Sequence, residues 1–334
     1  MAAVKDHTAE WTRKVKEYAL TTLQLSDIGI ARADALEESF ARYQLWLQYG
    51  YHGLLKYMAR NQDKRRDPRH ILPIARSVIV VAQNYYTPHR HRLRYGEGKI
   101  SRYAWGKDYH KILSKKLKRL ARFLTTLDPE VQSRFYVDTG PVLEKQWAVQ
   151  AGIGWQGKHS NVISRKFGSW FFIGVLLTSL PLEPDAPIPD FCGRCTACLD
   201  ACPTGAITQP YVVDARRCIS YWTIEVKPEI PIPDTIVEHL EGWLFGCDIC
   251  QEVCPWNRFQ QPTVEQRFHP QVGTTLPLEK IEAMDEEEFH QMFQGMPVKR
   301  AKLAGLKRTA RALRQWWSKQ IKRDIVTEFH HKTS

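Results

Sequence analysis

The sequence predicts an α/β (α+β) fold in its first half, followed by a cysteine-rich domain and a basic helical tail. Strand-like apolar runs alternate with amphipathic helical runs before a proline-rich stretch at 181–190, an order typical of mixed α/β domains. All eight cysteines lie after that stretch, and the chain ends in a helical segment rich in lysine and arginine. We therefore expect three parts, which are residues 1–180, 181–265 and 266–334.

The elements of the first part are predicted from apolar periodicity and from turn residues. The spacing of amphipathic helices is found in residues 8–22, 36–61 and 108–127. Apolar runs typical of buried strands cover residues 77–86, 134–138 and 169–180. Another helix is expected from Pro141, because proline suits the first position of a helix. Glycine-bearing loops are expected at 89–110 and 154–164.

The composition is that of a soluble protein, with 43% hydrophobic and 25% charged residues. The first residues lack the apolar core of a secretory signal. The most apolar run, Trp170–Leu177, is far shorter than the roughly 20 residues of a membrane helix. We therefore expect a cytoplasmic protein without a membrane partner. Lys and Arg number 48 against 36 Asp and Glu, and the net charge of +12 favours a polyanionic partner.

Seven of the eight cysteines form two short runs. The first is C-x2-C-x2-C-x3-C-P, and the second, "CDICQEVCP", is the same pattern without its first cysteine, which Cys218 supplies. In bacterial ferredoxins the fourth cysteine of such a run binds the neighbouring 4Fe-4S cluster. One cluster is therefore predicted on Cys192, Cys195, Cys198 and Cys254, and the other on Cys218, Cys247, Cys250 and Cys202.

Two other uses of these thiols compete with this prediction. A disulfide framework spreads its cysteines along the chain and suits small secreted proteins, so the clustering disfavours it. A closed tetrahedral zinc site can form from two C-x2-C pairs, and this alternative stays open. If the clusters are present they form a one-electron wire, and the long segment before them is expected to receive the electrons.

The cofactor of the first part is not determined by its motifs. A Rossmann fingerprint and a Walker A loop are absent. Asp108 and His110 begin the base-on cobalamin signature D-x-H-x-x-G, but Leu113 replaces its glycine. The conspicuous carboxylate is Asp138, at a strand end, where α/β folds place their chemistry. Asp138 equally suits the N-cap of the helix expected from Pro141, and both interpretations stay open.

Several long motifs resemble the epoxyqueuosine reductase family. They are "SRYAWGKDYH", "VDTGPVLEKQWAVQAGIGWQGKHSNVIS", the cysteine ladder and "GCDICQEVCPWN". The resemblance implies a monomeric enzyme, related to reductive dehalogenases, that reduces the epoxide of epoxyqueuosine at the wobble position of a tRNA anticodon to an alkene. It also implies a nitroreductase-like domain with base-off cobalamin, two 4Fe-4S clusters, the anticodon stem-loop as partner and an unidentified one-electron donor.

The resemblance also implies roles for individual residues. Asp138 matches the proton donor, which requires that burial raise its pKa. Residues expected beside the cobalamin are Arg60, Ser101, Arg102, Tyr103, Tyr109, His110, Asp138, Lys158, Asn161 and Ser220. Plainer roles compete with several of these: Arg60 as a surface charge, Lys158 and Asn161 as parts of a solvated loop, and Tyr109 as a core residue.

The tail is shorter than the HEAT-like repeat that many members of the family carry. It contains no acidic residue from Lys299 to Arg323, which suits tRNA phosphates. The residues expected to contact tRNA are Lys299, Arg300, Lys302, Lys307, Arg308 and Arg311. An apolar stripe at helical spacing comprises Leu303, Leu306, Ala310 and Leu313. A packed helix with a solvated basic face is therefore the alternative.

Two other functions remain compatible with the residues. A dehalogenase-like cobalamin enzyme acting on a small molecule would share the cofactors but would not need a basic tail. A non-catalytic electron carrier would need the clusters but not the long segment that precedes them.

Overall fold

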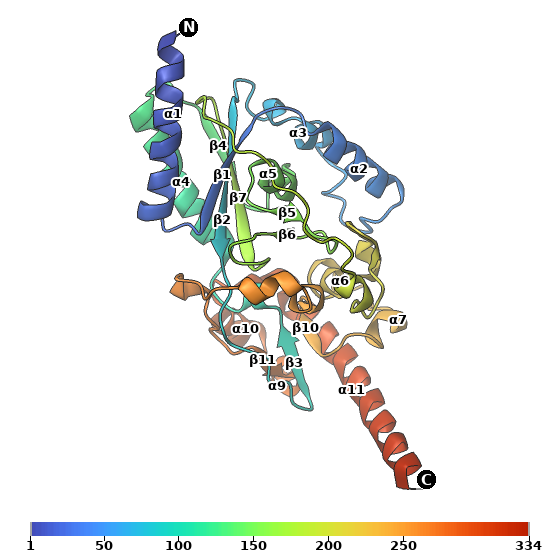
Figure 1. The fold of residues 1–334 in the computed structure, drawn as a ribbon. Coiled ribbons are helices and arrows are strands. Elements are labelled where there is room, and N and C mark those ends of the chain that lie inside the picture. Colours follow the sequence, from blue (N-terminus) through green and yellow to red (C-terminus); the bar gives the residue numbers. More distant parts are fainter. Residues whose placement is uncertain (1, 333–334) are drawn as a thin grey trace.

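The computed structural model describes the backbone of residues 2–332 and the side chains of residues 7–321 (Figure 1). Its main sheet has four antiparallel strands in the order β1-β2-β7-β4. They are β1 (Asp27–Arg32), β2 (Ser77–Asn84), β7 (Phe171–Thr178) and β4 (Ser133–Tyr136). β2 and β7 pair along their whole length, whereas the shorter β4 stops at Tyr136, opposite Val175. The chain therefore leaves the sheet edge just before Asp138.

Helices cover both faces of this sheet, which explains why every residue of β2 is buried. Ile79 and Val81 pack on one face with α1 (Ala2–Glu17) and α4 (Tyr109–Leu127). Val78 and Val80 pack on the other face with α5 (Glu144–Gln150). Figure 1 shows α1 and α4 on one side of the sheet and α5 on the other. The predicted mixture of helices and strands is confirmed. Because the strands of the sheet are antiparallel, the fold is of the α+β type.

The predicted helices at 8–22 and 108–127 are confirmed by α1, with its π-helical continuation Tyr18–Thr22, and by α4. The long helix expected at 36–61 is wrong beyond α2 (Glu37–Gln48). Gly50 and Gly53 adopt φ angles of +66° and +53°, which end the helix and turn the chain. A short helix, α3 (Gln62–Arg66), follows.

A second sheet joins residues that are far apart in the sequence. Its order is β10-β3-β11, formed by β10 (Trp243–Phe245), β3 (Glu97–Ile100) and β11 (Thr275–Pro277). β3 lies inside the segment 89–110, so the prediction of a continuous loop there is wrong. Ile100 and Trp105 are fully buried in the core of the C-terminal half.

The cluster region consists of short elements around the cysteine runs. α6 (Ala197–Asp200) and α8 (Ile249–Glu252) follow the first cysteines of each run and pack together. Two hairpins flank them, β5 (Trp155–Gln156) with β6 (Val162–Ile163) and β8 (Ile207–Gln209) with β9 (Val212–Val213). A further short α-helix in this region is α7 (Asp234–Val237).

The C-terminal part is helical, with α9 (Leu278–Ala283), α10 (Glu286–Met292) and α11 (Lys302–Lys332). The predicted apolar stripe of Leu303, Leu306, Ala310 and Leu313 is confirmed, because all four residues are buried in one core. Trp317 Nε1 donates to the carbonyl of Glu97 at 3.0 Å and fastens α11 to β3. Among the described residues, no helix combines the length and the apolarity needed to cross a membrane.

Candidate active site and cluster sites

Asp138 stands on a tight turn beyond β4. Its φ of +61° is uncommon for a residue with a Cβ, although aspartate tolerates it better than most residues. Glu144 holds this turn, because its Oε1 accepts a hydrogen bond from the backbone amide of Asp138 at 2.7 Å. α5 begins at Glu144, and its N-cap residue, Leu143, makes no side-chain cap. The prediction of a helix from Pro141 capped by Asp138 is therefore wrong.

The Asp138 carboxylate meets the first turn of α4. Tyr109 Oη donates to Asp138 Oδ2 at 2.8 Å, and His110 Nε2 lies 3.4 Å from the same oxygen. The other ring nitrogen of His110 lies 2.7 Å from Oδ1 of Asp108, which also caps α4 through the His110 amide. The Tyr109 ring stacks on Phe172 at 4.1 Å. Tyr109 is thus both a core residue and a partner of Asp138.

These contacts shift the pKa of Asp138 downward, opposite to the direction expected from the sequence. Its side chain is 63% exposed, yet the surrounding protein is dense enough that desolvation alone would raise its pKa. Hydrogen bonds from His110 and Tyr109, with the charges of His110 and Lys145, outweigh desolvation and lower the pKa. The expectation of a raised pKa is wrong because the partners on α4 favour the carboxylate.

His110 holds the proton that Asp138 gives up. Burial would lower the pKa of His110, but hydrogen bonds to Asp108 and Asp138 and their negative charges raise it to about 9. At neutral pH the pair therefore consists of an imidazolium and a carboxylate that share one proton.

Two residues of this site were not singled out in the sequence. Desolvation and the charge of Asp138 raise the pKa of Glu144 to about 8. Desolvation lowers the pKa of Lys145, whose ammonium interacts with the charges of Asp138, Cys250 and Cys218. Lys145 thus interacts with the charges of both Asp138 and the second set of thiols. Glu144 and Lys145 could have been found from the motif "VDTGPVLEK", because a turn and the start of a helix bring both residues back beside Asp138.

Two further predicted cofactor residues contact residues of this site, and a third lies at the second set of thiols. Asn161 Oδ1 accepts a hydrogen bond from Lys145 Nζ at 2.8 Å. Tyr103 packs edge-on against Tyr109, and desolvation together with the charge of Asp138 raises its pKa. Burial raises the pKa of the Cys218 thiol, and the amide and hydroxyl of the neighbouring Ser220 oppose this shift.

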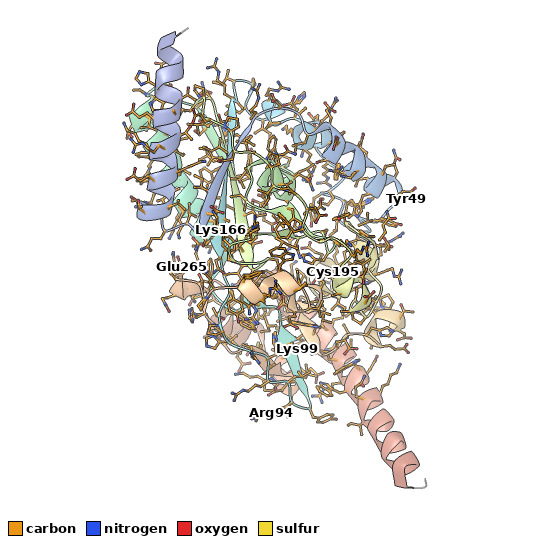
Figure 2. The ribbon with its side chains drawn as sticks, viewed as in Figure 1. Tyr49, Arg94, Lys99, Lys166, Cys195 and Glu265 are labelled. Carbon is orange, nitrogen blue, oxygen red and sulfur yellow. The ribbon has the colours of Figure 1, made fainter. Side chains whose placement is uncertain are left out.

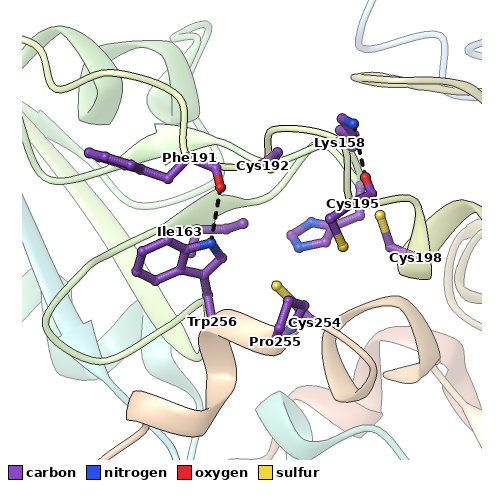
Figure 3. A pocket seen from close by; sticks show the side chains of 10 residues that line it. Lys158, Ile163, Phe191, Cys192, Cys195, Cys198, Cys254, Pro255 and Trp256 are labelled. Atoms are coloured by element: carbon purple, nitrogen blue, oxygen red, sulfur yellow. Dashed lines mark hydrogen bonds between the residues drawn. The ribbon is translucent and has the colours of Figure 1, made fainter.

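The other predicted cofactor residues have different surroundings. Ser101 Oγ donates to Asp248 Oδ1 at 2.5 Å, and the Arg102 amide donates to its other oxygen at 2.7 Å. Lys158 Nζ donates to the carbonyls of Gly193 and Cys195 at 2.7 and 2.9 Å, and Figure 3 shows the second of these bonds. These contacts fasten the cluster loops and do not reach Asp138.

Arg60 is exposed on the segment after α2, and among the described residues its side chain makes no hydrogen bond or ion pair. This surrounding matches the plainer role of a surface charge, which the sequence left open for this residue.

The first set of thiols lines one cavity. Cys192, Cys195, Cys198 and Cys254 surround it, although Cys254 comes from the other run (Figure 3). Desolvation and the charges of Cys254, Cys192 and Cys195 raise the pKa of Cys198 to about 11. Cys195 is exposed and lies beside α6 in the cluster region (Figure 2).

The second set gathers in the same crossed manner. Desolvation raises the pKa of Cys250, and the largest charge effects on it come from Cys218 and Cys202. The pKa of Cys247 is raised by desolvation and by Cys250 and Cys218. All eight cysteines are free, which excludes a disulfide framework. Four soft thiolates that repel one another need a cationic centre, and an iron–sulfur cluster supplies one.

The predicted tRNA contacts divide into two groups. Arg308 donates to the carbonyls of Val226, Lys227 and Ile230 at 2.8 to 3.1 Å and also to that of Trp222. Its guanidinium is thus part of the fold, and its assignment to tRNA is corrected. Arg300 pairs with Glu225 at 3.0 Å.

Four other basic residues have no such partner. Within the described part of the chain, no hydrogen bond or ion pair engages the side chains of Lys299, Lys302, Lys307 and Arg311. Lys322 and Arg323 lie outside the described side chains.

The mixed α/β fold, the carboxylate–histidine pair and two four-thiol sites are together typical of a redox enzyme. Residues 65–139 match the family model "Epoxyqueuosine reductase QueG, DUF1730", and residues 191–257 match the "4Fe-4S double cluster binding domain". The second match decides between iron–sulfur clusters and zinc in favour of two 4Fe-4S clusters.

Similar proteins support the same family. An epoxyqueuosine reductase of Synechocystis is 49% identical over 289 residues, which are 85% of this chain and 99% of the relative. A crystal structure of epoxyqueuosine reductase with an epoxyqueuosine-modified tRNA-Tyr stem loop has a TM-score of 0.85 and 30% identity, covering 92% of this chain and 82% of that one. A Bacillus subtilis structure with its catalytic aspartate loop swung out of the active site has the same TM-score, 29% identity and the same coverage. The chain belongs to the epoxyqueuosine reductase family, a family of oxidoreductases.

Proposed function

We propose that this chain reduces epoxyqueuosine at the wobble position of tRNA to queuosine, with Asp138 as the proton donor. Opening the epoxide and releasing its oxygen as water consumes two electrons and two protons and leaves an alkene. The observation that carries the proposal is the position of Asp138, which contacts the proton-holding His110 and neighbours Lys145, itself next to the second set of thiols.

The residues around Asp138 fit a base-off cobalamin, which when bound supplies a strongly reducing cobalt. Asp138 and Lys145 are accessible to solvent although protein surrounds them, so this position leaves room for a large cofactor. Tyr103 and Asn161 would hold the cofactor from two further segments. Ser220, at Cys218, would lie between it and the second cluster.

Electrons would enter at the first cluster and leave from the second. Cys195 of the first set is exposed, so a one-electron donor would reach that cluster from solvent. The thiols of the second set, Cys218 and Cys250, interact with the charge of Lys145 beside Asp138. This order makes the second cluster the one that delivers electrons to the reaction.

Protons would pass from His110 to Asp138 and on to the substrate oxygen. An epoxide oxygen is a poor leaving group as an alkoxide, so a proton donated as the C–O bond breaks lowers the barrier. Tyr109 fixes Oδ2 of Asp138 through its 2.8 Å hydrogen bond. Asp108 holds the other side of the imidazolium, so His110 can return a proton to Asp138 for the second transfer.

The anticodon would approach along the start of the basic tail. The charge of Arg300 interacts with Glu225, Tyr57 and Asp138, which places the beginning of the tail near the reaction site. Lys299, Lys302, Lys307 and Arg311 have unpaired ammonium or guanidinium groups in the described structure, and we assign phosphate contacts to them. The similar crystal structure with an epoxyqueuosine-modified tRNA stem loop supports this substrate.

The proposed organisation is a nitroreductase-like domain over 1–180, a two-cluster domain over 181–265 and a shortened HEAT-like tail over 266–334. β3 joins the core of the last part even though it lies in the first. We further propose a cytoplasmic monomer.

The test is anaerobic turnover of an epoxyqueuosine-bearing anticodon stem-loop by protein loaded with cobalamin and both clusters. Conversion to queuosine with a chemical reductant is expected, and omission of cobalamin should abolish it. A halogenated aromatic compound serves as the competing substrate. If the loaded protein dehalogenates that compound and leaves the stem-loop unchanged, the small-molecule function replaces the proposed one.

A further inference from the structure

His159 lies at the first set of thiols without a role in the reaction. It stands in the turn between β5 and β6, is 3% exposed, and lines the cavity formed by Cys192, Cys195, Cys198 and Cys254. The neighbouring glycine makes room for its ring, since a Cβ on Gly157 would come within 3.1 Å of His159 Cε1 and 2.6 Å of Ile163 Cδ1. The imidazole is therefore held in one place.

The hydrogen bonds of the turn fix the tautomer of this ring. The backbone amide of Asn161 lies 3.2 Å from His159 Nδ1, and because an amide only donates, Nδ1 is the acceptor and carries no proton. The ring N–H of the neutral imidazole is then on Nε2. That atom is buried and has no partner among the described residues, an arrangement that proteins rarely leave uncompensated.

The groups around the cavity leave sulfur as the remaining acceptor. Lys158 Nζ is a donor, and it is engaged by the carbonyls of Gly193 and Cys195. Trp155 Nε1 already donates to Cys192 Sγ at 3.4 Å, so one ring N–H near this cavity is directed at a ligand sulfur. The other residues that line the cavity, apart from the cysteines, are Ile163, Phe191, Pro255 and Trp256.

We infer that His159 Nε2–H donates a hydrogen bond to a sulfur of the first 4Fe-4S cluster and thereby raises the reduction potential of that cluster. A hydrogen bond to sulfur draws off negative charge and favours the reduced state, which carries one electron more. His159 is thus a positioning and tuning residue for electron entry. The inference rests on the first cluster of the proposed electron path, but not on the identity of the substrate.

The test is an anaerobic redox titration of both clusters, followed by EPR, on the full chain and three variants. His159→Phe removes the donor and keeps an aromatic ring, His159→Gln keeps an N–H, and Ile163→Val is a packing control in the same cavity. For His159→Phe, the equilibrium constant for reducing the first cluster should fall on the order of tenfold, or about 59 mV for a one-electron couple. His159→Gln should recover part of the shift, and the second cluster should not change.

A loaded His159→Phe protein with the potentials of the Ile163→Val control would overturn the inference. If His159→Phe does not assemble the cluster, ENDOR of the reduced full chain labelled with 15N-histidine decides the question. Coupling of a cluster to a histidine nitrogen and to an exchangeable proton is expected, and its absence would also overturn the inference. Both measurements omit tRNA, so a failure of the proposed epoxide reduction would not affect them.

Discussion

The two sets each consist of four cysteine thiols, but the residues that surround them differ. The first reaches solvent through the exposed Cys195, whereas all four cysteines of the second are half-buried. Aromatic residues such as Trp155 and Trp256 cover the first. Around the second lie a hydroxyl, from Ser220, and an ammonium, from Lys145. This difference supports the proposed direction of the wire, in which an external donor would reach the first cluster and the second would deliver electrons toward Asp138.

This asymmetry originates outside the cysteine runs. The hairpin of β5 and β6 covers the first cavity, and the first turn of α5 brings Lys145 to the second set of thiols. Both elements belong to the part of the chain that precedes the runs. The cysteine motif therefore supplies two similar sites, and the α/β part gives them the different surroundings on which the proposed entrance and exit rest.

The largest effect is expected from Cys202→Ser, which tests the crossed ligand sets. Cys202 stands in the first run, but its thiol charge acts on Cys218 and Cys250 of the second set. The variant should lose the second cluster, half of its iron and all measurable turnover, because electrons no longer reach Asp138. Iron and sulfide analysis with EPR checks this.

The matched control for that variant is Cys195→Ser, which should damage the first cluster instead. The clusters that survive in the two variants should therefore give different EPR spectra. Identical residual spectra would contradict the crossed assignment and the proposed direction of the wire.

Asp138→Asn is expected to have the next largest effect. Asparagine keeps the shape and the hydrogen bond from Tyr109 but carries no acidic proton, so turnover should fall roughly 10²- to 10⁴-fold. Both clusters should remain, since no thiol contacts Asp138. The measurement is single-turnover conversion of the modified stem-loop by fully loaded protein. Near-normal conversion would remove Asp138 from the proton path.

His110→Gln should have a smaller effect, one that depends on pH. The pKa of His110 is raised from 6.5 to about 9 in the folded chain, so the imidazolium stabilises the fold fully below pH 6.5 and this contribution disappears as pH rises through about 9. Wild-type turnover should fall over the same window, because Asp138 loses its proton source. In the variant, turnover should be lower and this pH-dependent decrease should be absent. A decrease that persists would assign it to another group.

The cysteine sites were predictable because their geometry is local. Spacings of two and three residues restrict where successive thiols can lie. Only Cys254 and Cys202 had to be assigned across the runs, and Cys218 from outside both. The position of Asp138 was also local, since it follows from where β4 ends. Its pKa was not, because Tyr109 and His110 come from the start of another helix.

The remaining errors share the same physical origin. β3 is four residues long, and its partners β10 and β11 lie far along the chain, so its own residues predict only a loop. Arg308 looks like its basic neighbours in sequence, yet the carbonyls of Val226 and Ile230 engage it after folding. Contacts between distant segments decide both cases, and no local pattern records them.

The smallest effect on turnover is expected from neutralising two residues of α11, the half-buried Lys307 and the exposed Arg311. They are four residues apart, hence on one face of the helix, and neither is paired within the described structure. Changing both to glutamine should weaken tRNA binding and reduce the slope of log affinity against log salt by about 1.5, at roughly 0.7 to 0.9 per phosphate contact. Turnover at saturating stem-loop should stay the same, because neither residue touches Asp138.

Arg308→Gln is the matched control, because it removes one charge from the same helix. Its guanidinium is hydrogen-bonded to the carbonyls of Val226, Lys227 and Ile230, so the loss should appear in stability, at about 2 kcal/mol for charged hydrogen bonds, and not in the salt slope. Salt titrations of stem-loop binding, together with thermal unfolding, separate the two variants. If Arg308→Gln changes the salt slope and the double variant does not, the assignments of Arg308 to the fold and of Lys307 and Arg311 to tRNA would be reversed. Lys307 and Arg311 would then form a solvated surface, and Arg308 would be the phosphate contact.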